Sequence, residues 1–346
     1  MNFISLLLLA SFAVHSASAT ASDVPDLNSA RVHVADRSDA EFKRGTAKAL
    51  EAVIVKLTGS SAAARTKSAR AVIGQAQRLV QQFGYESPRA ASSSTDALVL
   101  RVEFDSNVLH EKMRARQLVV WGKERPDTLI WLVIEDDNGR RLLGMQDTHQ
   151  ALQVFKRRAA ARGIPVVFPL GDISESAAVA QATSAASVAS AVREYSDTYN
   201  VRSVLVGYLR RAPTNLWEND WRLNGQGENS SWEQLGDVVE LLAEEAADSL
   251  ADRLGRRYAS SAQRSAAELV AVLIRGVTNP RDYARTQRYL GSVDSVRSLM
   301  VSRVDAEGVT FDLTVNGGLR ALTQTLSFGQ ILAPDPSEPS VFYLKP

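Results

Sequence analysis

The sequence predicts a mixed α/β protein, with α+β character in its outer parts, built from several small modules. Nearly continuous apolar segments, "TLIWLVIE", "GIPVVFPL" and "VRSVLVGYLRR", alternate with helical segments between residues 128 and 211. Such segments are typical of strands that are buried on both faces of a sheet. After residue 265 the patterns follow the order β-α-β-β-α, as in ferredoxin-like modules. We therefore expect a central mixed sheet flanked by helices and a C-terminal ferredoxin-like module.

The bulk composition is that of a globular protein and excludes several functions. The 346 residues, 45% hydrophobic and 23% charged, suffice for two or three domains with a sizeable core. A net charge of +1 gives no electrostatic reason to expect nucleic acid as a partner. The absence of cysteine excludes disulfides, thiol nucleophiles and cysteine-ligated zinc sites.

The N-terminus has the pattern of a secretory signal peptide over residues 1–19. An apolar run from Phe3 to Val14 precedes the small residues Ala17-Ser18-Ala19, which form a cleavage site. The run is shorter than the roughly 20 residues that span a bilayer. We expect a mature chain that begins near Thr20, lies in the periplasm and has no stable membrane insertion. The alternative is a buried N-terminal helix.

Residues 31–122 predict an N-terminal α+β module. "RVHVAD" alternates as a strand, and Asp39 is a candidate cap for a helix that ends at Gly59. A second helix is expected from Val72 to Phe83. "DALVLRVEFD" predicts a half-buried strand, and "SNVLHEKMRARQL" predicts a helix.

Residues 128–260 predict the central module. Asn138-Gly139 indicates a hairpin after the first apolar strand, and a helix is expected near Gln150 to Arg162. The Ala/Ser-rich stretch after residue 174 is expected to begin as a loop and continue as a helix. "WENDWRLNG" and the region of Trp232 predict antiparallel strands. A long closing helix is expected over "SWEQLGDVVELLAEEAADSLADRLGRRYA".

Residues 265–346 predict the small C-terminal module. "AELVAVLIRGV" is expected to be a strand, "NPRDYARTQRYLGSV" a helix and "VRSLMVSRVDAEGVTFDLTV" a strand pair. "GGLRALTQTL" follows as a short helix, and the proline-rich tail "APDPSEPSVFYLKP" is expected to be extended.

Several of these segments resemble one bacterial family. "ALEAVIVKLTG", "LRVEFD", "WGKERPDTLIWLVIED", "RGIPVVFPL" and "VLVGYLRR" occur in the same order in the family called domain of unknown function 2066. That resemblance covers nearly the whole mature chain and implies a secreted envelope protein with no assigned activity. "YNVRSVLVGYLRR" resembles the anticodon-binding-like modules of periplasmic assembly proteins. This second resemblance implies a binding role, although the chain lacks the lipidated cysteine of the lipoprotein members.

The stretch from residue 119 to 143 contains the strongest candidates for interaction. Trp121 precedes an Arg-Pro pair and is expected to wedge the first module against the second. Arg125 is expected to pair with an acidic group at that junction. The cluster Glu135-Asp136-Asp137 is either a carboxylate site or a turn, and its position before Asn-Gly favours the turn.

Three tryptophans in the central module form a second group of candidates. Trp217, Trp221 and Trp232 either form an interaction surface or cover the sheet beneath the long helix. Because a spacing of four puts Trp217 and Trp221 on one face of a strand, the two side chains should lie together. We favour burial beneath the helix.

The chain lacks the motifs of common catalytic and cofactor sites. His33, His110 and His149 have no metal-ligand spacing, and no phosphate loop or nucleophile motif occurs. No cofactor or metal is therefore expected. The sequence favours a non-enzymatic periplasmic binding or assembly factor, whose partner is an envelope protein or the cell wall. The alternatives are an envelope hydrolase with an unrecognised site and a glycan-binding protein.

Overall fold

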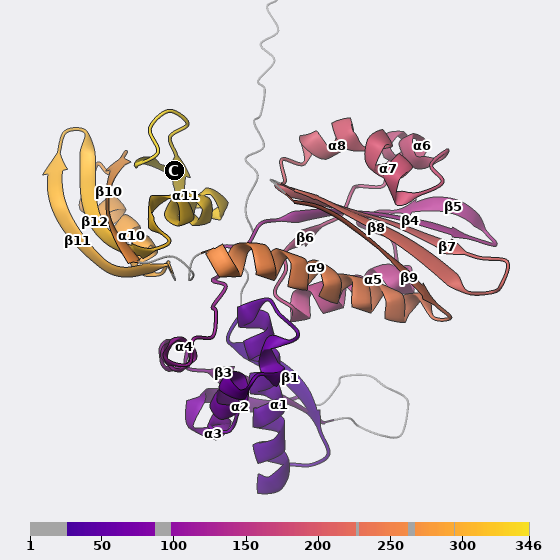
Figure 1. Ribbon diagram of the computed structural model, residues 1–346, viewed down its shortest axis with the longest axis horizontal. Coiled ribbons are helices and arrows are strands. Elements are labelled where there is room, and N and C mark those ends of the chain that lie inside the picture. The colour runs from indigo at the N-terminus through magenta and orange to yellow at the C-terminus, as the bar shows by residue number, and fades with distance from the viewer. Residues whose placement is uncertain (1–25, 87–97, 226–227, 262–266, 294, 346) are drawn as a thin grey trace, which may run out of the picture.

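The computed structural model describes residues 26–86, 98–225, 228–261, 267–293 and 295–345. The predicted signal peptide, residues 1–19, lies outside the described residues. Helices and three mixed or antiparallel sheets confirm the predicted α/β class within these ranges (Figure 1). No helix in the described ranges has the length and apolar character needed to cross a membrane.

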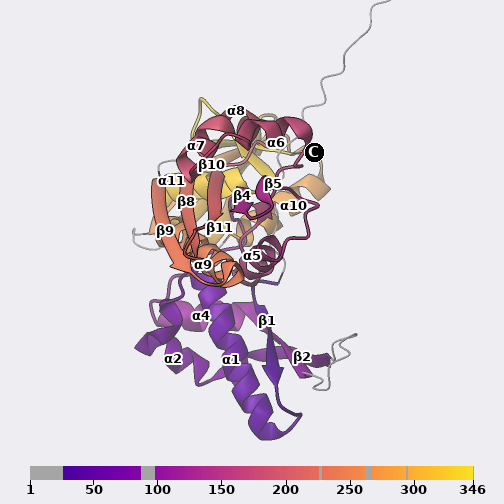
Figure 2. The same ribbon diagram turned by 90° about the vertical axis from the view of Figure 1, so that its right-hand side faces the viewer.

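The N-terminal module packs helices on an antiparallel sheet with the strand order β1-β3-β2. Its elements are β1 (Ser29–Val34), α1 (Asp39–Thr58), η1 (Ala63–Arg65), α2 (Lys67–Ile73), α3 (Ala76–Leu79), β2 (Val80–Glu86), β3 (Leu98–Phe104) and α4 (Ser106–Ala115). Fully buried side chains of α1, such as Leu50 and Ile54, share a core with Leu100 and Val102 of β3. Figure 2 shows this module below the rest of the molecule.

Two local predictions for this module need correction. The side chain of Ser38, rather than that of Asp39, caps α1 by accepting a hydrogen bond from the Glu41 amide. The predicted helix from Val72 to Phe83 is wrong, since α2 and α3 are short and residues from Val80 onward form β2. Pairing with β3 supplies hydrogen-bond partners that outweigh the local helical pattern.

The central module contains a mixed sheet with the strand order β5-β4-β7-β8-β9, and β6 pairs with β4. Its elements are β4 (Thr128–Asp136), β5 (Gly139–Leu143), α5 (Gln150–Ala161), β6 (Val166–Val167), α6 (Ile173–Val179), α7 (Ala185–Ala191), α8 (Arg193–Thr198), β7 (Ser203–Arg211), β8 (Trp217–Gly225), β9 (Glu228–Gly236) and α9 (Val239–Ser261). β4 and β7 are parallel, whereas the other main pairs are antiparallel.

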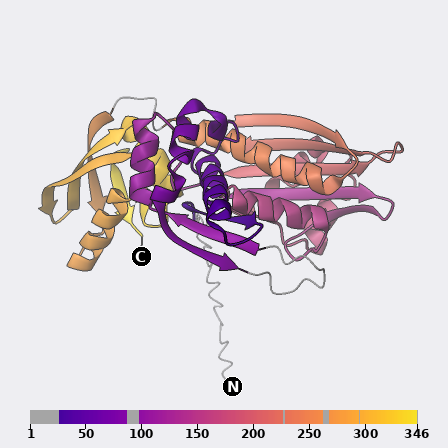
Figure 3. The same ribbon diagram turned by 90° about the horizontal axis from the view of Figure 1, so that it is seen from below.

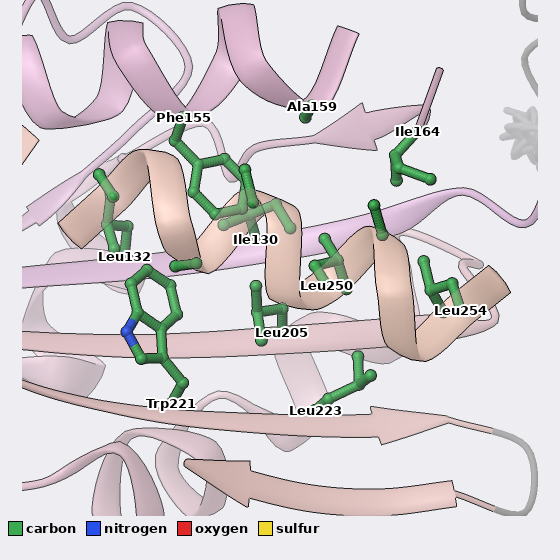
Figure 4. Close-up of a cluster of buried hydrophobic side chains, with 14 of the residues drawn as sticks. Ile130, Leu132, Phe155, Ala159, Ile164, Leu205, Trp221, Leu223, Leu250 and Leu254 are labelled. Carbon is green, nitrogen blue, oxygen red and sulfur yellow. The ribbon is translucent and has the colours of Figure 1, made fainter. Parts of the chain in front are cut away.

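Helices cover both faces of the central sheet, as the continuous apolar strands predict. Ile130 and Leu132 of β4 pack with α5 and α9, whose side chains Phe155 and Leu250 lie in the same core (Figure 4). Trp131, between them in the sequence, faces the opposite core with α6 to α8. Alternation along one strand therefore fills two separate cores.

Sequence reasoning misplaces two boundaries in the central module. The closing helix begins at Val239 rather than near Ser231, because residues 228–236 pair with β8 as an antiparallel strand. The stretch expected to begin as a loop contains α6, α7 and α8, each six or seven residues long.

The C-terminal module has the strand order β11-β12-β10-β14-β13. Its elements are β10 (Ala267–Arg275), α10 (Pro280–Gly291), β11 (Val296–Asp305), β12 (Gly308–Asn316), α11 (Gly318–Phe328), β13 (Leu332–Pro334) and β14 (Val341–Leu344). The order of β11, β12 and β10 fits a ferredoxin-like module. The proline-rich tail contains extended strands, as expected: β13 and β14 form a hairpin, and β14 joins β10 in parallel.

Candidate functional site

Arg125 lies at the contact between the N-terminal and central modules and is fully buried. Its Nη2 donates to the Lys56 carbonyl at 2.8 Å, at the end of α1. Its Nη1 donates to the Gly163 carbonyl at 2.9 Å, just beyond α5. The guanidinium therefore occupies the negative ends of two helices from different modules. These hydrogen bonds go to main-chain oxygens rather than to a carboxylate, and the predicted ion pair stays a prediction.

Trp121 joins the same junction through aromatic contacts. Its side chain is 3% exposed, and the Arg125 guanidinium lies 4.2 Å from its ring centroid. The ring stacks on Tyr258 of α9 with centroids 6.2 Å apart, and Tyr258 meets Phe328 of α11 edge to face at 5.3 Å. This chain of three rings connects the segment after the N-terminal module, the central helix α9 and the C-terminal module.

A charged network next to these rings joins α5 to α9. Arg162 donates to Asp248 and to Asp252, each at 2.6 Å, and Arg158 donates to Asp248 at 2.7 Å. Ser61, which follows α1, donates its hydroxyl to Asp252 at 2.6 Å. Burial disfavours the charged form of Asp252, but hydrogen bonds from Ser61 and Arg162 outweigh it and lower its pKa.

Backbone packing brings α1 and α9 together at two glycines. Gly59 ends α1 with φ of 65°, a left-handed conformation that favours glycine. A Cβ atom placed on Gly255 of α9 would lie 2.4 Å from the Gly59 carbonyl oxygen. Because any side chain would force the helices apart, Gly255 fixes how closely α9 approaches the N-terminal module.

Lys56 is a buried cation beside Arg125. Its Nζ donates to the Asp26 carbonyl at 3.0 Å and to the Ser29 carbonyl at 2.8 Å. Burial, together with the nearby positive charge of Arg125, lowers the pKa of Lys56 to about 8. The junction therefore contains a group that changes charge in mildly alkaline solution.

A recess of about 1190 Å³ opens beside this junction, and we call it the junction groove. One wall comes from α4 and from residues 26–28 of the N-terminal module, and the other comes from the end of α10 and the start of β11. Figure 3, seen from below, shows the purple helix α4 next to the yellow C-terminal module in projection, and Figure 1 shows that α4 lies below that module. Its lining includes Asp26, Leu57, Asn107, Glu111, Arg114, Lys123, Val293, Val296 and Arg297.

The structure places the three other candidate tryptophans in the core beneath α9. Trp221 is fully buried and stacks between Phe155 at 5.9 Å and Trp232 at 6.0 Å. Trp217 and Trp232 are partly buried against the same core. They form no common site with Arg125. Their position beneath α9 agrees with the prediction that they cover the sheet.

The acidic cluster before the hairpin is divided among separate contacts. Glu135 accepts hydrogen bonds from Tyr208 and, at 3.1 Å, from Arg140. The Tyr208 hydroxyl is the main cause of the lowered pKa of Glu135. Asp136 accepts from the Asn138 amide at 2.8 Å, and the side chain of Asp137 is 87% exposed. Within the described ranges, no group of histidines and carboxylates is arranged to hold a metal ion.

Sequence reasoning missed most of the residues that surround Trp121 and Arg125. Lys56, Arg162, Tyr258 and Phe328 come from segments far apart in the chain, and no local pattern connects them. One signal is visible in retrospect. Arg158 and Arg162 repeat at a spacing of four on one helix, as Asp248 and Asp252 do on another, which predicts two matching charged faces.

Comparison with known families gives one match. A family model described as a domain of unknown function (DUF8605) matches residues 21–122, less than a third of the chain. This fits the expectation of a domain without an assigned function. It does not support the name of the 2066 family or the anticodon-binding-like resemblance of the middle part. No curated protein matches the chain.

Proposed function

We propose that this protein is a non-enzymatic binding or assembly factor of the cell envelope, and that its partner binds in the junction groove. One observation carries the proposal: residues from the N-terminal module, the segment around Lys123 and the C-terminal module line a single recess. Binding sites occur preferentially between domains. A partner there would contact both outer modules at once.

The pKa values of the carboxyl groups favour binding over hydrolysis. A carboxyl group that acts as a general acid needs a pKa raised towards neutrality. Among the described carboxyl groups, every one with a displaced pKa has it lowered, such as Asp172, which accepts hydrogen bonds from Glu175 and Ser174. None of these groups lines the junction groove.

The placement of the tryptophans gives little support to the glycan-binding alternative. A glycan platform needs exposed aromatic faces. Trp121 and Trp221 are buried, and Trp217 and Trp232 are partly covered by the core beneath α9.

Placement in the periplasm is part of the proposal and depends on the signal-peptide pattern. The resemblance to the 2066 family of secreted proteins and to anticodon-binding-like assembly modules points to the same compartment and to a binding role. Mass spectrometry of the native protein tests export, with an N-terminus near Thr20 as the expected result. An intact Met1 in a cytoplasmic fraction would contradict it.

Site-specific photo-crosslinking tests the groove itself. A photoreactive residue at Asn107, which lines the groove on α4, is placed in the full chain in its native envelope. Glu51, an exposed residue of α1 in the same module, is the matched control. The proposal expects a specific protein adduct from position 107 and none from position 51. Equal labelling at both positions, or no adduct from position 107, would refute it.

A further inference from the structure

We infer that the occupant of the junction groove is an extended acidic peptide segment of a partner protein, which continues as an added strand along β11. This inference rests on the proposed function and names the chemistry of the partner. Three separate features of the groove support it: its size, its excess of positive charge and the strand edge that starts within it.

The size of the groove favours a peptide over a small molecule. Pockets for small molecules commonly measure about 300–1000 Å³. The junction groove, at about 1190 Å³, is larger. Leu57, Val293 and Val296 provide apolar contact, while most other lining side chains are polar or charged. A recess of mixed character suits a peptide, which has a polar backbone and alternating side chains.

The charges that face the groove favour an acidic occupant. Arg114, Lys123 and Arg297 line it, and none of the three forms an ion pair with another described residue. Two carboxylates also line the groove. A carboxylate oxygen of Asp26 lies 3.9 Å from the Arg101 guanidinium, so only Glu111 remains to balance the three positive charges. Carboxylates of a bound segment would accept hydrogen bonds from these three cationic side chains.

The start of β11 explains why the segment should be extended. Among the strands that the structure describes, β11 is the outer strand of its sheet, next to β12, and none of them pairs with its other edge. The register with β12 shifts between Val296 and Ser298, so that Arg297 has no partner on β12. Such bulges re-aim a side chain beside a site, and Arg297 lines the groove. A segment that contacts Arg297 is therefore positioned to pair with the exposed edge of β11.

The test uses the full mature chain and fluorescent octapeptides, with binding measured by anisotropy. The main probe alternates valine and glutamate. One matched probe alternates valine and lysine, and a second repeats the acidic sequence with N-methyl groups on alternate residues. We expect the acidic probe to bind at least about tenfold more tightly than either matched probe. Arg297→Glu should weaken its binding about tenfold, while Arg281→Glu, an exposed residue of α10 in the same module, should leave it unchanged.

Each failure has a defined meaning. Equal binding of the acidic and basic probes would overturn the charge preference, and equal binding of the N-methylated probe would overturn strand addition. Absence of binding by the acidic probe, or an equal loss in the Arg297→Glu and Arg281→Glu variants, would overturn the inference as a whole. Melting temperatures of both variants exclude misfolding as the cause. Because crosslinking from Asn107 uses the native partner, an adduct there without probe binding would leave the proposed function intact and reject only this inference.

Discussion

At the scale of single residues, Arg125 shows how one buried arginine satisfies the ends of two helices. The last carbonyls of a helix lack partners within the helix. A guanidinium has five donors in one plane, and that of Arg125 reaches the carbonyl groups of Lys56, Trp121, Gly122 and Gly163 at 2.8–3.0 Å. One side chain thereby supplies hydrogen-bond donors to the ends of α1 and α5 and to the segment around Trp121 and Gly122.

Removal of the Arg125 guanidinium should strongly destabilise the protein. Arg125→Met leaves several buried carbonyls without donors, and we expect the free energy of unfolding to fall by about 3–5 kcal/mol. Arg222→Met, which alters an exposed arginine of β8, is the control and should change it by less than about 0.5 kcal/mol. Urea denaturation measures both. A loss below about 1 kcal/mol for Arg125→Met would show that the carbonyls find other partners.

Lys56 gives a prediction for the dependence of stability on pH. Its pKa in the folded protein is about 8, below the ordinary value of 10.5, so the unfolded chain binds the proton more tightly. The free energy of unfolding should therefore rise as pH increases from about 8 towards 10.5, by up to about 3 kcal/mol. Tyr199 acts in the opposite sense at higher pH, because its pKa is raised from 10.0 to about 12.

The measurement for Lys56 is the urea midpoint at pH 8 and at pH 10, below the range in which Tyr199 dominates. The natural chain should gain stability between these values, and Lys56→Met should gain much less. The same gain in both proteins would assign the effect to other groups.

Trp131 tests whether the apolar strand β4 is buried on both faces. Its side chain is fully buried, and its Nε1 donates to the Ser196 hydroxyl at 2.9 Å. Trp131→Ala should lower the free energy of unfolding by about 3–5 kcal/mol. Asp137→Asn, at the exposed turn that ends the same strand, should have almost no effect on thermal melting. A large loss of stability from the Asp137 variant would contradict the interpretation of the acidic cluster as a turn.

At the scale of elements, α5 and α9 are joined by complementary charges at equal spacing. The side chain of Arg162 is only 4% exposed, and it contacts Asp252 of α9. A double-mutant cycle with Arg162→Ala and Asp252→Ala should give a coupling energy of about 1–3 kcal/mol. The same cycle on Arg210 and Glu218, an exposed pair within the sheet, should give less than about 1 kcal/mol. Equal coupling in the two cycles would mean that burial adds nothing to the α5–α9 contact.

The sequence predicts those elements whose hydrophobic period is strong and whose ends have clear signals. α1 ends at Gly59, and β4 and β5 meet at the Asn138-Gly139 turn as expected. Where the local pattern predicts the wrong element, pairing with a neighbouring strand determines the structure of the segment. β2 contains Phe83 at helical spacing from preceding residues, but pairing with β3 makes this segment a strand. The start of the predicted closing helix, near Trp232, likewise pairs with β8.

The sequence reveals less of the site than of the fold. Trp121 and Arg125 are conspicuous because an aromatic ring and an Arg-Pro pair stand between two predicted modules. The residues that contact them cannot be recognised in the sequence, because they are distant along the chain. The Arg125 contact with Lys56 spans 69 positions, and the Arg162 contact with Asp252 spans 90. The groove depends on how α4 meets the C-terminal module, and only the assembled chain contains that information.

At the scale of the whole molecule, α9 is the element that all three modules share. Figure 1 shows its C-terminal end reaching from beneath the central sheet towards the other two modules. Gly255 contacts the end of α1, and Tyr258 lies between Trp121 and Phe328. Docking of the C-terminal module should therefore depend on aromatic contacts near the end of α9.

Phe328→Ala tests this dependence. Phe328 is 5% exposed, and it belongs to the central core although it ends a helix of the C-terminal module. Its loss removes the contact with Tyr258 but leaves the core around Phe311 intact. We expect the C-terminal module to remain folded but to dock less firmly, at a cost of about 3–5 kcal/mol. Small-angle scattering should then show a larger radius of gyration with unchanged secondary structure by circular dichroism.

Two comparison variants separate loss of docking from loss of folding. Phe311→Ala removes a fully buried ring from the core of the C-terminal module and should unfold that module, with a loss of strand signal. Tyr343→Ala, at a residue that is 42% exposed, should change neither measurement. Because Phe328 lines the small recess beside the junction groove, looser docking should also weaken crosslinking from Asn107. A Phe328→Ala protein as compact as the natural chain, with normal crosslinking, would show that α9 does not control the position of the C-terminal module.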